Sequence, residues 1–158
     1  MADEVGCGMA FIRVVFAYGL AVVVGTILVT AAATQITLQE LVALGIDIPM
    51  NVRLESTMRD LAGFSPTLAP LLVIGFLAAF LAAAMVIHFV PSWRTIGYTL
   101  AGFATIIVVM AAVKFFINMQ LYSGITPVPA ARTLAGLMIM AAGGALAGLT
   151  FAATTRRD

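Results

Sequence analysis

The chain has 158 residues and a net charge of +1, and its composition excludes an ordinary water-soluble domain. Hydrophobic residues make up 63% of the chain and charged residues 9%, whereas soluble domains have about 45–50% and about 25%. So few charges cannot cover a water-facing surface, and we expect most of the surface to face lipid. The small net charge gives no electrostatic basis for binding nucleic acid, and the single cysteine, Cys7, excludes a disulfide within the chain.

Four stretches are apolar enough to cross a bilayer as helices, each needing about 20 residues. They cover about residues 11–34, 66–90, 95–118 and 133–153. Ser65 precedes the second span as a hydroxyl cap, and Pro66 takes the first helical position. A very short connection containing Trp93 makes spans two and three an antiparallel hairpin, and no span is expected to contain an internal proline. The predicted fold is all-α, a single-domain four-helix transmembrane bundle.

The connection between spans one and two, about residues 35–65, is expected to be partly helical and extramembrane. Thr37 and Glu40 have the spacing of a capping box, which predicts a short helix that ends at Gly45. A second short helix is expected to end at Gly63. Both are predicted to lie at the membrane surface or over the bundle. The apolar face of the second consists of Leu54, Met58 and Leu61.

The positive-inside rule hardly decides the membrane orientation, because the basic residues divide equally between the two sides. The pair Arg156-Arg157 and the short second connection favour both termini in the cytoplasm. In that orientation the cytoplasmic group is Arg13, Arg94, Arg156 and Arg157. The group on the other side is Arg53, Arg59, Lys114 and Arg132.

Every span carries a row of small residues at four-residue spacing, which allows helix backbones to approach closely in lipid. In the fourth span Gly144 and Gly148 form a GxxxG pair. Either all four rows face inward in one bundle, or the fourth span's row contacts a second subunit. The other rows are Ala17, Ala21 and Gly25; Gly75, Ala79 and Ala83; and Gly97, Ala101 and Thr105.

The middle of each span lacks the ionisable side chains that usually mark ion paths and proton relays. Thr26 and Thr105 are the polar side chains there, and both are expected to bond to carbonyls of their own helix. The spans contain no paired carboxylates, and the chain shows no phosphate-binding glycine loop or metal-ligand spacing. We therefore expect neither catalysis nor ion-coupled transport by this chain alone, and no cofactor of its own.

His88, near the end of the second span, is the single histidine. Two-histidine haem ligation within the chain is therefore excluded. His88 could still be a single axial ligand to a haem shared with a partner subunit, or it could form a hydrogen bond to a quinone. The simpler interpretation is an interfacial imidazole beside Trp93, whose amphipathic ring suits the headgroup level.

Lys114 lies at the opposite membrane face and is expected to extend its ammonium to the headgroups. Arg132 precedes the fourth span, where the helix dipole disfavours a cation. It is expected to pair with Asp60 or Glu55, to bind an anionic lipid headgroup or a partner's carboxylate, or simply to lie exposed at the interface.

Two segments carry a resemblance: Asp60-Leu61-Ala62-Gly63 before the second span, and residues 127–133 (Pro-Val-Pro-Ala-Ala-Arg-Thr) before the fourth. They resemble a family of small four-span bacterial inner-membrane proteins left uncharacterised. The resemblance follows the order of the spans and implies a multi-pass protein of a bacterial inner membrane. It implies no activity.

Intact spans, small-residue faces and absent chemistry favour a non-catalytic accessory or anchoring subunit of a larger membrane complex. Its partners would be membrane lipids and other subunits or a second copy. The alternative is a binding protein or carrier for a lipid, quinone or other apolar ligand. Its pocket would lie under the long connection, near Lys114, Asn118 and Arg132.

Overall fold

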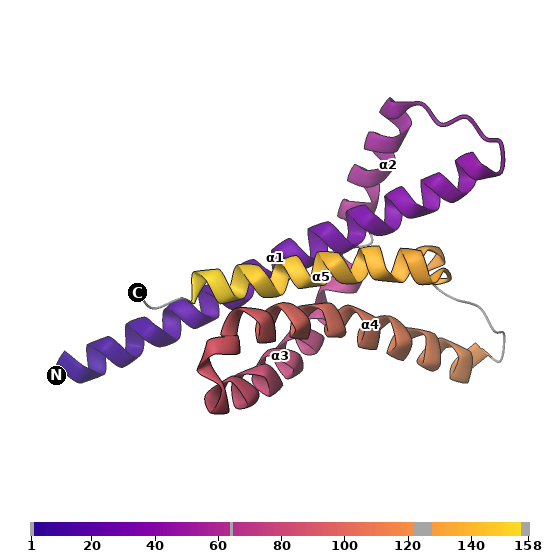
Figure 1. Ribbon diagram of the computed structural model, residues 1–158. Coiled ribbons are helices and arrows are strands. Elements are labelled where there is room, and N and C mark those ends of the chain that lie inside the picture. The colour runs from indigo at the N-terminus through magenta and orange to yellow at the C-terminus, as the bar shows by residue number, and fades with distance from the viewer. Residues whose placement is uncertain (1, 64, 122–127, 156–158) are drawn as a thin grey trace.

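The computed structural model describes residues 2–63, 65–121 and 128–155, and nearly all of them are helical (Figure 1). Four helices are long and apolar enough to cross a membrane: α1 (Ala2–Ala43), α3 (Ser65–Phe89), α4 (Arg94–Leu121) and α5 (Leu134–Thr154). The connections hold α2 (Met50–Gly63) and two short 3-10 helices, η1 (Pro91–Trp93) and η2 (Pro129–Ala131). The protein is thus an all-α, multi-pass membrane bundle, as the sequence predicted.

Helix α1 is twice as long as a single span requires. Its 42 residues extend about 63 Å at about 1.5 Å per residue, against a hydrocarbon layer of about 30 Å. The separate helix predicted from Thr37 to Gly45 is wrong, because the first span continues through it. No glycine or proline interrupts α1 between Gly25 and its end. The Thr37 hydroxyl donates to the carbonyl of Ala33 at 2.9 Å, so it does not cap a new helix.

Polar contacts tie α1 to other helices at two levels. At one level Arg13 Nε donates to the Thr154 carbonyl at 3.0 Å. At the other, Thr34 donates to the Asp60 carboxylate at 2.7 Å. Along the helix these levels are about 31 Å apart, which matches the hydrocarbon thickness. We call them the Arg13 level and the Asp60 level.

The α1–α2 hairpin, defined as residues 35–63, begins at the Asp60 level and projects from the bundle (Figure 1). Gly45, with a φ of 87°, makes the turn after α1. The second short helix predicted from the sequence is confirmed as α2, and it ends at Gly63 as expected. The extramembrane connection is therefore a helical hairpin built partly from an extension of the first span.

An aromatic cluster joins all four long helices near the Arg13 level. The ring of Phe80 stacks on Phe151 at 4.6 Å between centroids and on Phe76 at 5.3 Å. Tyr98 and Tyr18 meet the same ring edge-on, at 5.7 and 6.4 Å. The Tyr18 hydroxyl donates to the carbonyl of Val73, which ties α1 to α3.

The closest helix contact is between α4 and α5, where the two backbones touch through glycines. A Cβ added to Gly102 would lie 2.2 Å from the Gly144 carbonyl oxygen, and one on Gly148 would lie 2.0 Å from the Tyr98 carbonyl oxygen. Gly144 and Gly148 are buried. The predicted partner contact through these two glycines is therefore wrong, because α4 already covers that face.

The other small-residue rows also face the interior. Ala17 and Ala21 are fully buried. A Cβ on Gly25 would meet the Phe76 ring at 2.8 Å, and one on Gly75 would meet Thr105 at the same distance. The interpretation of all four rows as the packing of one bundle is confirmed for these positions.

The two threonines near the middle of the layer bond as predicted. Thr26 donates to the Val22 carbonyl at 2.8 Å, and Thr105 donates to the Ala101 carbonyl at 2.7 Å. The expectation of spans without internal proline is wrong, since Pro70 lies inside α3. Pro70 has no N–H to donate to the carbonyl of Pro66, but it lies close to the start of the helix, which remains continuous.

Replacing Gly102 or Gly148 by alanine should lower the free energy of unfolding by about 1–3 kcal/mol, because the added methyl forces α4 and α5 apart. Gly19 is the matched control, since nothing lies within 4 Å of a Cβ there. Denaturant unfolding in a mild detergent, followed by circular dichroism, measures the difference. Equal stabilities for Gly102→Ala and Gly19→Ala would contradict the close α4–α5 contact.

Candidate functional site

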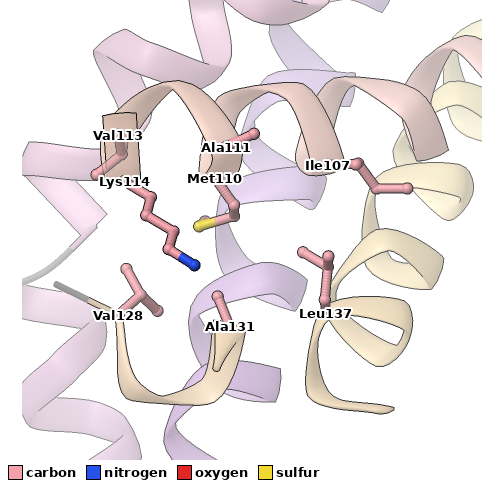
Figure 2. Close-up of a pocket in the computed structure, with 8 residues that line it drawn as sticks. All are labelled: Ile107, Met110, Ala111, Val113, Lys114, Val128, Ala131 and Leu137. Carbon is pink, nitrogen blue, oxygen red and sulfur yellow. The ribbon is translucent and has the colours of Figure 1, made fainter. Parts of the chain in front are cut away.

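A cavity of about 220 Å³ lies between α4, η2 and the first turn of α5 (Figure 2). Seven of its eight lining residues have apolar side chains, and the eighth is Lys114. Helix α4 supplies one wall, while η2 and α5 supply the other. The lining residues are Ile107, Met110, Ala111, Val113, Lys114, Val128, Ala131 and Leu137.

The Lys114 side chain crosses this cavity. Figure 2 shows its ammonium turned inward, between Met110 on one side and Val128 and Ala131 on the other. The sequence predicted an ammonium that extends to the headgroups, and the structure turns it towards the cavity instead. Lys114 as a whole remains exposed, so the cavity communicates with the outside of the bundle. The cation is therefore available to an anionic group that enters.

The wall formed by η2 is held by its own backbone hydrogen bonds and by its packing on α5. Pro129 begins the 3-10 turn after an extended Val128, and Ala130 is fully buried. Thr133 then caps α5, its hydroxyl accepting from the N–H of Gly136 at 3.1 Å. A Cβ on Gly136 would lie 2.1 Å from the Ala130 carbonyl oxygen, so this turn packs directly on the helix it precedes.

A second cavity, of about 390 Å³, lies between α1, α2 and η2. It differs from the first in its chemistry, because half of its lining residues are polar. Hydroxyls come from Thr34, Thr37 and Ser56, and a carboxylate comes from Asp60. The apolar lining consists of Ala33, Leu38, Val128 and Pro129.

Two hydrogen bonds fix α2 over this cavity. Asp60 accepts from Thr34 at 2.7 Å, and the amide of Gln35 donates to the Thr57 hydroxyl at 2.9 Å. Only one oxygen of the Asp60 carboxylate is used in the hydrogen bonds of the described residues. The other oxygen can accept from a ligand.

The two cavities adjoin at Val128, which lines both and is itself buried. An apolar cavity with a cation thus lies next to a polar cavity with a carboxylate. The sequence could not bring these charges together, because Asp60 and Lys114 lie on different helices. The sequence predicted one pocket under the long connection and near Lys114. In the described residues these two features belong to different cavities: Lys114 lines the first, and the long connection covers the second.

The other two residues predicted near this pocket are Arg132 and Asn118. Arg132 is exposed, follows η2 and does not line either cavity. Its two predicted partners have other contacts: Glu55 pairs with Arg59 at 2.9 Å, and Asp60 bonds to Thr34. Asn118 belongs to α4, but its side chain lies outside the described residues.

His88 and Trp93 are at the Arg13 level, far from both cavities along α3 and α4. Both are exposed, and the His88 ring contacts Phe89 edge-on at 5.7 Å. Within the described part of the chain, no three His, Cys, Asp or Glu side chains gather as a metal site would require. The predicted shared cofactor at His88 stays a prediction.

Arginines bind the C-terminal end of α5 at this same level. Arg94 donates to the carbonyl and the hydroxyl oxygen of Thr155 at 2.6 and 2.7 Å. Arg13 binds the neighbouring carbonyl of Thr154. Cations are favourable at a helix C-terminus, where carbonyls lack helical partners. These contacts lock α1 and α4 to the end of α5.

No family model, curated protein or solved structure matches this chain. The resemblance to four-span bacterial inner-membrane proteins therefore stays a prediction. The fold defines the class, a multi-pass helical membrane protein, and the function has to be argued from the two cavities.

Replacing Arg94 by methionine should lower the free energy of unfolding by about 1–3 kcal/mol, because charge-assisted bonds to α5 are lost. Arg59→Met is the control, since the contact of that arginine within the described residues is an exposed ion pair on α2. Thermal unfolding in detergent at fixed ionic strength provides the comparison. If both variants unfold alike, the arginine contacts do not hold the end of α5.

Proposed function

We propose that this chain binds an amphiphilic membrane molecule in the cavity between α4, η2 and α5, and that Lys114 holds its anionic group. The observation that carries the proposal is the ammonium of Lys114 directed into walls that are otherwise apolar (Figure 2). Lys114 is exposed at the opening of the cavity, so its ammonium can form a charge-assisted hydrogen bond with the counter-charge of a ligand. An anionic ligand supplies that counter-charge.

The size and position of the cavity favour part of a lipid over a compact solute. Pockets that enclose a drug-sized ligand measure about 300–1,000 Å³, and this one has about 220 Å³. It accommodates the part of an acyl chain next to a headgroup, while the remainder lies in the bilayer. Lys114 lies about 30 Å along α4 from Arg94, which places it at the opposite headgroup level.

A quinone is a weaker candidate for the same cavity. Its carbonyl could accept a hydrogen bond from Lys114, but it carries no charge to compensate the ammonium. In this proposal the chain performs no reaction itself. It binds, presents or carries the amphiphile in a bacterial inner membrane.

Replacing Lys114 by methionine should weaken lipid binding about tenfold or more, because a charge-assisted hydrogen bond is lost. The delipidated protein is titrated with phosphatidylglycerol in detergent, and binding is read by native mass spectrometry. Ala131→Phe fills the cavity but keeps the charge, and it should weaken binding as well. Lys114→Arg should retain it.

The surface variant Arg59→Met controls for the loss of one positive charge. Unchanged affinity in both Lys114→Met and Ala131→Phe would remove the cavity from consideration. Loss in Lys114→Met alone would mean that the lipid contacts the ammonium without entering the cavity, which would also contradict the proposal.

A second candidate function, an accessory or anchoring subunit, is favoured by the outer face of α2. Met50, Leu54 and Met58 are 81, 58 and 61% exposed, beyond the Asp60 level. Thr57 and Asp60 of α2 bond to α1, while Met50, Leu54 and Met58 stay exposed. Exposed apolar patches of this kind mark interaction sites.

Leu54→Asp combined with Met58→Asp should release any partner bound to α2, since a charge on each turn prevents apolar contact. Gentle purification from the native membrane followed by native mass measurement gives the test. Wild-type protein should carry a stoichiometric partner that the variant lacks, while Glu55→Gln retains it. An identical assembly in all three proteins would exclude this face as the docking surface.

The orientation with both termini in the cytoplasm belongs to the same proposal. Arg13 and Arg94 bind α5 at one level, which groups them on one side of the membrane. The count of basic residues is equal on the two sides, so the Arg156-Arg157 pair and the short connection between α3 and α4 favour the cytoplasm for this side. The two cavities and the α1–α2 hairpin then lie on the periplasmic side.

A further inference from the structure

Two opposite charges flank Val128, and their arrangement specifies more than an apolar ligand. Lys114 lines the cavity on one side of Val128, and Asp60 lines the cavity on the other. Neither charge is joined to the other by an ion pair, since the ion pair formed among the described residues is Arg59–Glu55. A ligand that spans Val128 therefore meets a cation first and a carboxylate next.

The second cavity is equipped to accept hydrogen bonds. One carboxylate oxygen of Asp60 accepts from Thr34, and the other takes no part in that hydrogen bond. The Thr37 hydroxyl donates its hydrogen to the Ala33 carbonyl, so its oxygen is left as an acceptor. A primary ammonium donates up to three hydrogen bonds and matches such a set of acceptors.

Other common headgroups fit this cavity less well. A quaternary ammonium donates no hydrogen bond and is usually held by aromatic rings, and the described lining residues include no aromatic side chain. A headgroup with no cation, such as glycerol, leaves the Asp60 carboxylate without a counter-charge. The polar cavity therefore discriminates between headgroups that the apolar cavity would treat alike.

We infer, resting on the function proposed above, that the ligand is a phospholipid with a primary amine in its headgroup. Its phosphate binds Lys114, its ammonium binds Asp60, and its acyl chain lies against Met110 and Leu137. A soluble phosphoethanolamine has the same charges but nothing to occupy the apolar cavity. The lipid is the source that uses both cavities.

Selectivity between lipids with identical acyl chains tests the inference. Phosphatidylethanolamine, phosphatidylcholine and phosphatidylglycerol compete for delipidated full-length protein, and bound lipid is identified by native mass spectrometry. Wild-type protein should prefer the ethanolamine lipid about tenfold, the effect of about one charge-assisted hydrogen bond. Asp60→Asn should abolish this preference while it keeps affinity for phosphatidylglycerol.

Asparagine at position 60 still accepts from Thr34, so α2 stays in place, and thermal unfolding verifies this. Asp47→Asn removes the same charge from the exposed turn of the α1–α2 hairpin and should leave selectivity unchanged. An undiminished ethanolamine preference in Asp60→Asn overturns this inference but leaves the binding function intact.

Two further outcomes separate the remaining alternatives. If Lys114→Met binds all three lipids as wild-type protein does, the proposed function itself is wrong. If glycerophosphoethanolamine displaces the bound lipid at equal concentration, the apolar cavity contributes nothing and the lipid is rejected as the ligand.

Discussion

The backbone contact between α4 and α5 is the constraint on which the bundle depends. Lipid gives no hydrophobic gain for helix association, so close van der Waals packing must supply much of the attraction. Gly102, Gly144 and Gly148 provide it because none of them has a side chain to hold the two backbones apart. Helices α1 and α3 then pack around this pair through the aromatic cluster at Phe80, and the arginines secure the end of α5.

The same contact determines where a cavity forms. The glycine contact on α5 begins at Gly144, and towards the start of that helix larger side chains take over. There Ile107 and Met110 of α4 face Leu137 of α5, and the η2 turn rests on Gly136. Helices held at contact distance at one end and separated by side chains at the other leave space between them. Lys114 lies at that open end.

Apolar length alone predicted the four spans, and the start of α3 at Ser65 followed from capping chemistry. The continuation of α1 past Thr37 could not be predicted from capping chemistry, because a threonine three residues before a glutamate has the same spacing inside a helix as at a cap. The pocket was expected near Lys114, but its pairing with Asp60 could not be predicted. It depends on how α2 and η2 fold over α1, which no local pattern encodes.

The central claim is that α4, η2 and α5 enclose a lipid whose headgroup lies between Lys114 and Asp60. A crystal structure grown from a lipidic phase containing phosphatidylethanolamine tests it most directly. The account predicts elongated density against Met110 and Leu137 that ends beside the Lys114 ammonium and the Asp60 carboxylate. A cavity closed by its own side chains, with Lys114 turned out to the headgroups, would contradict it.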